Sequence, residues 1–348
     1  MSTHMFAFAT ALIAAVSLTP AARQLAFKLD FIDRPDARKL HLKPMPLLGG
    51  LAIYTAAVLA ILLFTESTAQ SQIIGILAGA TLLAVVGIMD DRGLLHHQIK
   101  LLVAMPLAAL ILLISGVHAE VFSWPPADYA LTLFWVVGIT AAFSIHDHMD
   151  GLCAGIAAIA SAFFLLFALL GQQVLVATLA AAMLGASLGF LQWNLYPAKI
   201  FMGDAGAMFL GFMMATLALK LRPPVLLDTP PWMISVLIVG VPIFDTALIS
   251  ISRARRGLIP FTSPGKDHTA HRLANLRLGQ RRAVLSLYAL GIFFGAVALS
   301  LTRLPAWQSY VVVGALVLAG LVAIFLLERA PYEKQRKEKP QMQRAGKA

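Results

Sequence analysis

The stretch Val86-Gly87-Ile88-Met89-Asp90-Asp91-Arg92 places two adjacent carboxylates at the end of an apolar run that begins at Ile73. An ionised carboxylate close to lipid costs several kcal/mol unless another group compensates for its charge. A divalent cation is the natural compensation, because Mg²⁺ prefers oxygen ligands. The stretch therefore predicts a membrane helix that ends in a polar site.

The composition of the whole chain is that of a polytopic membrane protein. Of its 348 residues, 59% are hydrophobic and 13% are charged, which is too little charge to cover a soluble domain of this length. The net charge of +10 is typical of basic cytoplasmic loops and does not indicate a nucleic-acid partner. The single cysteine, Cys153, excludes an intramolecular disulfide and a multi-cysteine metal site. Residues 1–22 do not look like a cleaved signal peptide, because no Lys or Arg precedes their apolar run.

Apolar segments long enough to cross a bilayer recur along the chain. They are residues 4–22, 47–64, 73–89, 100–117, 129–146, 155–171, 174–192, 206–221, 232–251, 283–302 and 309–327. We therefore expect an all-α fold of about eleven transmembrane helices, forming one integral-membrane domain over residues 1–327. Residues 328–348 are basic and predict a disordered cytoplasmic tail.

Basic residues gather in alternate loops and predict the orientation in the membrane. With the N-terminus outside, the inner side holds 24 of the 27 Lys and Arg residues, in segments 23–46, 90–100, 193–205, 252–282 and 328–348. Cytoplasmic loops carry such an excess, so the C-terminus is expected in the cytoplasm. An odd number of spans agrees with this orientation, since an even number would place the basic tail outside.

The predicted topology brings the acids that border the apolar segments to one membrane face. They are Asp90 and Asp91 after the third segment, Asp147 and Asp150 after the fifth, Asp204 before the eighth, and Asp245 one to two turns inside the cytoplasmic end of the ninth. If residues 147–150 are helical, their two carboxylates share one helix face. Asp204 stands between two glycines at a loop-to-helix start, where backbone N–H groups can hold an anion.

Each of these features also has a purely structural explanation. An acid at a helix end is usually a cap, and Lys100 at a membrane interface commonly extends toward water. His268 and His271 in the basic loop would suit the polar face of an amphipathic helix. The structural explanations weaken together, because four acidic sites recur on one face. The pair Asp90–Asp91 could bridge Mg²⁺ to a diphosphate, while Lys100 and the basic loop neutralise the remaining phosphate charge.

Taken together, these motifs resemble the polyprenyl-phosphate sugar-1-phosphate transferases over roughly residues 20–290. The first element is similar to D-x-P-x-x-R-K-x-H-x-x-P-x-P-x-x-G-G and favours the N-acetylglucosamine branch; it is Asp33 to His41 with Pro44, Pro46, Gly49 and Gly50. The other matching elements are Gly87 to Asp91 with Lys100, Pro197 to Gly206, Val241 to Asp245, and Asp267 to Leu273.

The element after the fifth segment departs from the family pattern N-x-x-N-x-x-D-[GN]-x-D-G. Ala141 and Ser144 stand at the asparagine positions, and His148 replaces Gly or Asn. Lost amides would remove hydrogen bonds to the substrate or to a metal ligand, so a catalytically degenerate member is an alternative. We hypothesise that His146 and His148 replace part of the missing polar groups. Unchanged activity of their double alanine variant would argue against that hypothesis.

The resemblance implies a reaction, its partners and its location. An N-acetylhexosamine-1-phosphate would pass from a UDP-sugar to undecaprenyl phosphate or another polyprenyl phosphate, with release of UMP, for synthesis of cell-envelope polysaccharide. The setting would be the cytoplasmic face of a bacterial-type inner (plasma) membrane. Mg²⁺ is the implied cofactor, with Mn²⁺ as an alternative, and a homodimer is left open.

The resemblance also implies roles for individual residues. Asp204 would be the main metal ligand, helped by Asp90 and Asp91. One of that pair could instead deprotonate the lipid phosphate, and a covalent aspartyl-phosphate is a third route. Asp147 and Asp150 would be catalytic residues that position the nucleotide or the metal. The expected substrate-binding residues are Arg38, Lys39, His41, Lys100, Asp245, His268, His271 and Arg272.

Two rival functions make different predictions. A lipid or solute transporter without catalysis would be expected to place its acids near the bilayer midplane and to show repeat symmetry. This sequence instead places its acids at one interface and shows no visible repeat. A membrane metal site could use four histidines, but no H-E-x-x-H spacing is present; they are His146, His148, His268 and His271.

Overall fold

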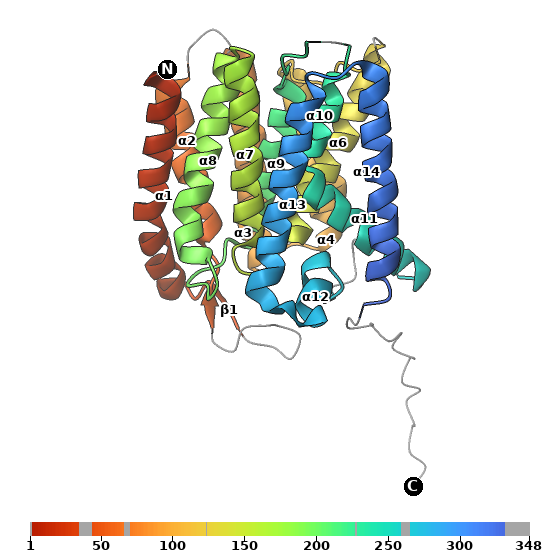
Figure 1. The fold of residues 1–348 in the computed structure, drawn as a ribbon. Coiled ribbons are helices and arrows are strands. Elements are labelled where there is room, and N and C mark those ends of the chain that lie inside the picture. The colour runs from red at the N-terminus through yellow and green to blue at the C-terminus, as the bar shows by residue number, and fades with distance from the viewer. Residues whose placement is uncertain are drawn as a thin grey trace.

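The computed structural model describes residues 2–34, 44–65, 70–122, 124–226, 228–258 and 265–330. In these ranges the chain forms a bundle of long helices (Figure 1). The long helices are α1 (Ser2–Lys28), α2 (Gly49–Phe64), α3 (Gln70–Asp91), α5 (Met105–Ile114), α6 (Pro125–His146), α7 (Leu152–Leu170), α8 (Val174–Asn194), α9 (Gly203–Lys220), α10 (Pro231–Ile238), α11 (Gly240–Arg255), α13 (Gly279–Leu301) and α14 (Ala306–Leu327). The shorter elements are α4 (His97–Ile99), η2 (Lys100–Ala104), α12 (Thr269–Leu273) and η3 (Ala274–Leu278).

Every apolar segment predicted from the sequence coincides with one helix or with two consecutive helices. Seven helices of the described ranges are long and apolar enough to cross a membrane, or eight if α10 and α11 form one bent span. The helix α2 and the segment Lys100–Ile114 are apolar but shorter. The length and composition of these helices make the chain a multi-pass membrane protein.

The ninth predicted segment is not the single helix that its hydropathy suggested. Helix α10 ends at Ile238, α11 begins at Gly240, and the two are bent by 72°. Pro242 lies in the first turn of α11, where it has no N–H to continue the hydrogen bonding of α10. Helix α11 also continues past the predicted end at residue 251 to Arg255, so Asp245 lies almost three turns from the helix end, farther inside than predicted.

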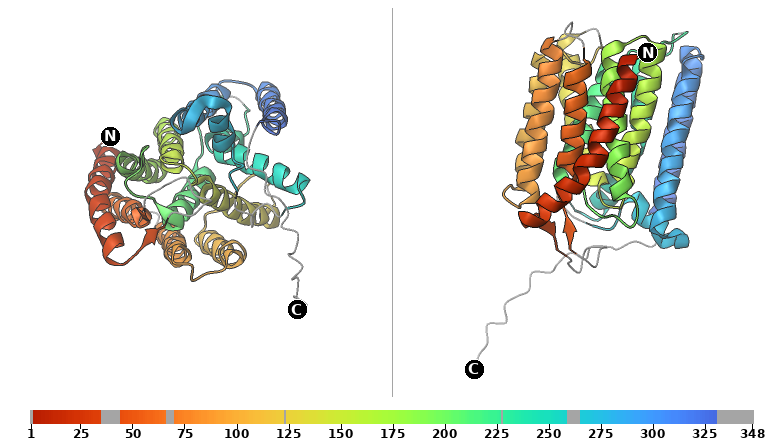
Figure 2. Two further views of the ribbon diagram at one scale, coloured as in Figure 1. Left: turned by 90° about the horizontal axis from the view of Figure 1, so that it is seen from below. Right: turned by 90° about the vertical axis from the view of Figure 1, so that its left-hand side faces the viewer.

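Helix α9 forms the centre of the bundle. All of its residues except Asp204 and Lys220 are buried, as expected for a helix that is apolar on every side. It packs against α3, α6 and α2, and a view along the bundle shows it surrounded by other helices (Figure 2). Its first turn, which carries Asp204, therefore lies in the middle of the molecule.

A short antiparallel hairpin, which the all-α prediction omitted, lies below the bundle (Figure 1). Strand β1 (Ile32–Asp33) pairs with β2 (Met45–Pro46). Backbone hydrogen bonds join β2 and the start of α2 to the segment before α9: Phe201 N–H donates to the Pro46 carbonyl at 2.9 Å, and Gly50 N–H donates to the Met202 carbonyl at 2.8 Å. The hairpin thus fixes the approach to α9.

Helix α14 lies at the periphery of the bundle (Figure 2). Only Ser309 and Ile324 of this helix are buried. The beginning of α1 and the end of α14 lie at opposite ends of the bundle (Figure 1).

Candidate functional site

Side chains from α3, η2, α6 and α9 meet at one end of the bundle. We call this group the acid cluster, and its members are Asp90, Asp91, Lys100, Ser144 and Asp204. The Lys100 ammonium donates to Oδ2 of Asp90 and to Oδ2 of Asp204, both at 2.7 Å. The side chains of Asp90 and Asp204 keep 15% and 23% of their exposure. Two carboxylates from distant parts of the sequence thus converge on one positive charge and remain accessible.

Asp91 occupies a different position from its neighbour Asp90. Its Oδ1 accepts the backbone N–H of Asp204 at 2.8 Å, and its Oδ2 accepts that of Ala205 at 3.3 Å. A carboxylate at a helix N-terminus accepts hydrogen bonds from N–H groups that have no partner within the helix, and the positive end of the helix dipole stabilises its charge. Asp91 therefore joins the end of α3 to the start of α9.

The backbones of α3 and α9 approach closely beside the acid cluster. A Cβ atom at Gly87 would lie 2.3 Å from Ala205 Cα, far inside van der Waals contact. At the start of α9, Gly203 adopts a φ of +70°, which glycine tolerates and most residues avoid. The two glycines allow the short distance between Asp90 and Asp204.

Asp147 and Asp150 do not share a helix face, because the condition for that arrangement, a helix over residues 147–150, is not met. Helix α6 ends at His146, and α7 begins only at Leu152, so the intervening residues are not helical. Asp150 Oδ2 accepts the backbone N–H of Ala198 at 2.9 Å. Asp150 thereby connects its loop to the segment before α9.

Asp147 lies in a strongly negative environment. Burial raises the pKa of its carboxyl to about 8, and the charges of Asp204, Asp91 and Asp150 act in the same direction. A carboxyl with this pKa is mostly protonated at neutral pH. The concentration of negative charge at this end of the bundle favours a bound cation.

Two polar residues support the site in ways that the sequence interpretation missed. Ser144 was expected only as a lost asparagine, yet its hydroxyl donates to Asp204 Oδ1 at 2.8 Å. Buried Asn194 accepts the Gly151 N–H at 3.0 Å and donates to the Ile200 carbonyl at 2.9 Å. In the sequence, the role of Asn194 could have been inferred from its amide side chain, which stands at the end of an apolar segment and directly before a turn.

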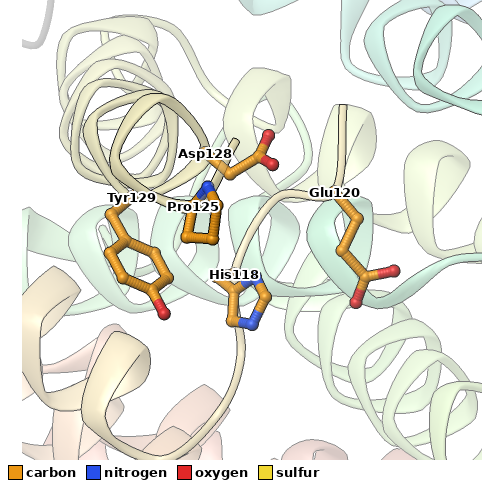
Figure 3. Close-up of a pocket in the computed structure, with 5 residues that line it drawn as sticks. All are labelled: His118, Glu120, Pro125, Asp128 and Tyr129. Carbon is orange, nitrogen blue, oxygen red and sulfur yellow. The ribbon is translucent and has the colours of Figure 1, made fainter. Parts of the chain in front are cut away.

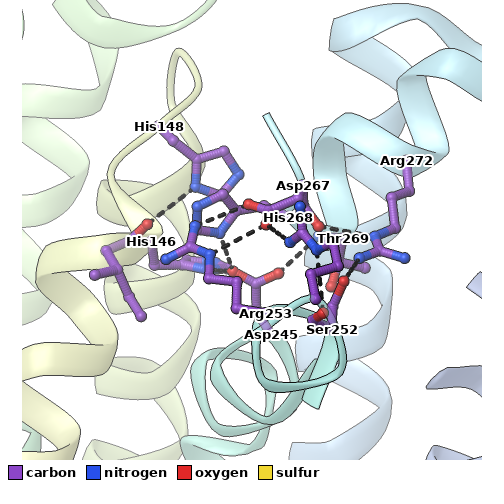
Figure 4. Close-up of polar contacts among 11 residues, drawn as sticks. His146, His148, Asp245, Ser252, Arg253, Asp267, His268, Thr269 and Arg272 are labelled. Carbon is purple, nitrogen blue, oxygen red and sulfur yellow. Dashed lines mark hydrogen bonds and ion pairs between the residues drawn. The ribbon is translucent and has the colours of Figure 1, made fainter. Parts of the chain in front are cut away.

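A second polar group lies beside the acid cluster and is called here the histidine cluster (Figure 4). Its members are His146, His148, Asp245, His268 and His271. Asp245 Oδ2 accepts from Nδ1 of His268 at 2.8 Å and lies 3.3 Å from Nδ1 of His146. The ring of His148 stacks on those of His268 and His271, with centroids 3.9 and 4.7 Å away. His146 and His148 thus face these side chains, and the hypothesis that they replace the missing asparagines stays a prediction.

Arg272 was predicted to bind substrate phosphate, but in this structure its guanidinium is completely buried. It donates to Ser252 Oγ at 2.8 Å, to the Leu327 carbonyl at 2.8 Å and to Glu328 Oε1 at 2.6 Å. These contacts connect α12 to α11 and to the end of α14. They give Arg272 a structural role, and its predicted binding of substrate phosphate stays a prediction.

Asp267 holds the basic loop in place. Its carboxylate accepts from Arg253 Nη2 at 2.8 Å and from Arg256. Burial opposes its ionisation, but the hydrogen bonds and charges of the two arginines outweigh that effect and lower the pKa of Asp267 to about 2. Since His268 follows directly in the chain, this ion pair also positions the histidine cluster.

Replacing Asp267 by Asn should therefore destabilise the protein. Removing one partner of a buried ion pair typically costs about 3–5 kcal/mol. Because the folded-state pKa lies below the ordinary value, the stabilisation is complete above about pH 4 and is lost as the pH falls toward 2. We expect thermal unfolding in detergent to show that the variant is less stable than the wild type by the same amount at pH 7 and at about pH 4.5. Asp30→Asn is the matched control, since Asp30 is 69% exposed beside Arg34; a deficit as large in this control would contradict the interpretation.

Three predicted substrate-binding residues lie outside the described residues, and they are Arg38, Lys39 and His41. Most of the predicted tail, residues 331–348, also lies outside them.

A cavity of about 260 Å³ lies at the other end of α6 (Figure 3). It is lined by His118, Glu120, Pro125, Asp128 and Tyr129. Asp128 accepts the backbone N–H groups of Val121 and Phe122 at 2.8 and 3.1 Å, so it shapes the loop before α6. The cavity is separate from the acid cluster, which lies at the C-terminal end of this helix.

The donor set of the acid cluster fits a hard divalent cation. Mg²⁺ is usually bound by one or two carboxylates together with water and substrate phosphates. Asp90 and Asp204 supply two such carboxylates, which already share the Lys100 ammonium. Both oxygens of Asp91 accept backbone N–H groups, so its contribution to a metal would be mainly electrostatic.

Comparison with known proteins relates this arrangement to a family. The family model described as Glycosyl transferase family 4 matches residues 73–222, a range that contains the acid cluster. A probable undecaprenyl-phosphate N-acetylglucosaminyl 1-phosphate transferase of Bacillus subtilis is 36% identical, over 90% of this chain and 88% of its own. A decaprenyl-phosphate N-acetylglucosaminephosphotransferase of Mycobacterium tuberculosis is 31% identical, over 92% and 88%. Since this similarity extends over nearly the whole length of both chains, the protein belongs to glycosyl transferase family 4.

Proposed function

We propose that the protein transfers an N-acetylhexosamine-1-phosphate from a UDP-sugar to a polyprenyl phosphate and releases UMP. The names of its relatives support the sugar phosphate and the lipid acceptor. The observation that carries the proposal is the convergence of Asp90 and Asp204 at one end of the bundle. A lipid phosphate at the headgroup plane and a soluble nucleotide-sugar can meet at such a place. The cytoplasmic face of a bacterial inner membrane is the proposed setting.

In this proposal, Asp90 and Asp204 hold Mg²⁺, or Mn²⁺ in its place. The bound ion would neutralise the diphosphate, since phosphoryl transfer depends mainly on positioning and charge stabilisation. An oxygen of the lipid phosphate forms a bond to the phosphorus that carries the sugar. The bond from that phosphorus to the UMP oxygen breaks, and UMP leaves.

The remaining residues bind, orient or move a proton. If Asp204 holds the metal without Asp90, Asp90 could instead take a proton from the lipid phosphate; it is a better candidate than Asp91, because both Asp91 oxygens already accept backbone N–H groups. Lys100 would neutralise a phosphate oxygen. Asp147 and Asp150, on the loop between α6 and α7, would orient the nucleotide.

The proposal is tested with purified protein, undecaprenyl phosphate and a panel of UDP-N-acetylhexosamines. We expect UMP release from at least one donor, only when the lipid phosphate and Mg²⁺ or Mn²⁺ are present. Chelation should stop the release, and added metal should restore it. Release of no UMP from any donor would contradict the proposal and favour a catalytically degenerate member.

We also propose eleven spans in one membrane domain, with the N-terminus outside and the C-terminus in the cytoplasm. Cys153 is completely buried, so we expect the wild-type chain to react little with cysteine-labelling reagents. A membrane-impermeant maleimide should label Arg303→Cys in intact cells. It should label Arg277→Cys only after the membrane is opened. The reverse pattern would overturn the orientation.

A further inference from the structure

The histidine cluster gathers metal-ligating side chains from three separate parts of the chain. His146 and His148 come from the end of α6 and the loop after it, Asp245 from α11, and His268 from the residue before α12 (Figure 4). His271 lies in α12. His146 is completely buried, and Asp245 is 1% exposed. Four imidazoles and one carboxylate therefore lie together, with His148 half-buried and the other four side chains buried.

Three imidazole nitrogens in this cluster have no hydrogen-bond partner among the described residues. They are Nε2 of His146, Nε2 of His148 and Nδ1 of His271. A buried polar atom without a partner is costly, and three such atoms in one cluster need a common explanation. A ligand that accepts electron pairs from several nitrogens would supply it.

The surroundings already orient potential ligands. Nδ1 of His148 lies 3.2 Å from the Ile145 carbonyl, an acceptor, so this nitrogen carries the proton and Nε2 keeps its lone pair. Asp245 Oδ1 accepts the Thr269 N–H at 2.7 Å. Metal-binding histidines commonly donate their second ring N–H to a carbonyl, and ligating carboxylates are themselves hydrogen-bonded.

We propose that the histidine cluster binds a borderline divalent metal ion, with Zn²⁺ the best match, separately from the hard cation of the acid cluster. One ligand atom each from His146, His148 and Asp245 lies within 4.8 Å of the other two. Ligand atoms around tetrahedral zinc are about 3.3 Å apart, as bonds of about 2.0 Å require, so modest side-chain rotations complete the site. Three protein ligands leave a fourth position for water, as in many zinc sites, while His271 stays stacked on His148 and His268 keeps its hydrogen bond to Asp245.

The two sites differ in donor chemistry. Imidazole nitrogens suit zinc and other transition metals, whereas carboxylate oxygens suit Mg²⁺. The absence of an H-E-x-x-H motif does not count against the zinc site, because its ligands come from different elements. Bound metal would tie the loop that carries Asp147 to α11 and α12, and so hold that loop beside the acid cluster.

The test is a titration of the chelator-treated, detergent-purified wild-type protein with Co²⁺, which reports a tetrahedral site by its visible absorption. We expect one equivalent to bind, Zn²⁺ to displace it, and excess Mg²⁺ to leave it in place. If Mg²⁺ displaces the bound Co²⁺, or if Co²⁺ gives no visible absorption band, the proposal is overturned. Both outcomes are measured on the folded wild-type protein, so they do not depend on any variant. No substrate is present, so failure here is distinguishable from failure of the proposed transfer.

Variants then locate the ion. His148→Gln and His146→Gln should each weaken Co²⁺ binding by at least about 100-fold, because each removes a ligand. His118→Gln, at the other end of α6, is the matched control and should bind as the wild type does. Asp204→Asn should also keep the band, since Asp204 lies in the acid cluster. Equal binding by the His148→Gln and wild-type proteins would overturn the assignment.

Discussion

We expect the Asp204→Asn protein to release UMP about 10²–10³ times more slowly than the wild type. Asparagine keeps the shape of the side chain but removes its charge, so the proposed metal loses a carboxylate and Lys100 loses one of two anionic partners. The Ser144 hydroxyl also loses its charged acceptor. The rate is measured as UMP release with saturating donor and lipid over a range of Mg²⁺ concentrations, and we expect the remaining activity to need more metal.

The control for this change is Asp228→Asn, which alters an exposed acid remote from the acid cluster. Its rate and its Mg²⁺ requirement should equal those of the wild type. Thermal unfolding of both variants separates loss of chemistry from loss of fold. An Asp204→Asn protein that is folded and releases UMP at the wild-type rate would remove Asp204 from the proposed site.

Gly87→Ala should have the second largest effect, a decrease in rate of about 10²-fold. The new methyl group would lie 2.3 Å from Ala205 Cα, and a backbone atom cannot move aside as a flexible side chain can. Helices α3 and α9 must separate, and Asp90 moves away from Asp204. Misplacing reacting groups by about 1 Å is enough for a loss of this size. UMP release by the purified variant measures the effect.

Gly138→Ala is the matched control, because a Cβ atom at Gly138 meets nothing within 4 Å. In a helix this change alone is neutral or mildly stabilising. The control variant should therefore be as active as the wild type and at least as stable. Equal activity of the Gly87→Ala and Gly138→Ala proteins would show that the close approach of α3 and α9 does not control the chemistry.

The sequence predicted the parts of the fold that depend on local hydropathy. Each apolar segment is helical, as one helix or as two consecutive helices, and the acids that border the segments lie at one end of the bundle. The bend between α10 and α11 was missed because a long apolar segment has the same hydropathy whether straight or broken. Its signal was Pro242, only four residues after Ile238.

The roles of individual polar residues were harder to predict, because they depend on tertiary contacts. Asp90 and Asp91 are adjacent in sequence, yet one shares Lys100 with Asp204 and the other caps α9. Arg272 resembles the other cations of its loop in sequence, but packing against the end of α14 buries it. Burial and helix docking, which no local pattern records, made these distinctions.

The link between Asp91 and the start of α9 has a consequence for how the protein is made. Ribosomes synthesise α3 long before α9, so a nascent chain inserted only as far as α8 contains Asp90, Asp91 and Lys100 but neither Asp204 nor the start of α9 that Asp91 caps. The cap, the Lys100 bridge to Asp204 and the close packing at Gly87 form together when α9 enters the bundle. An incomplete or misassembled copy in the membrane would therefore lack the assembled acid cluster and could not carry out the proposed transfer.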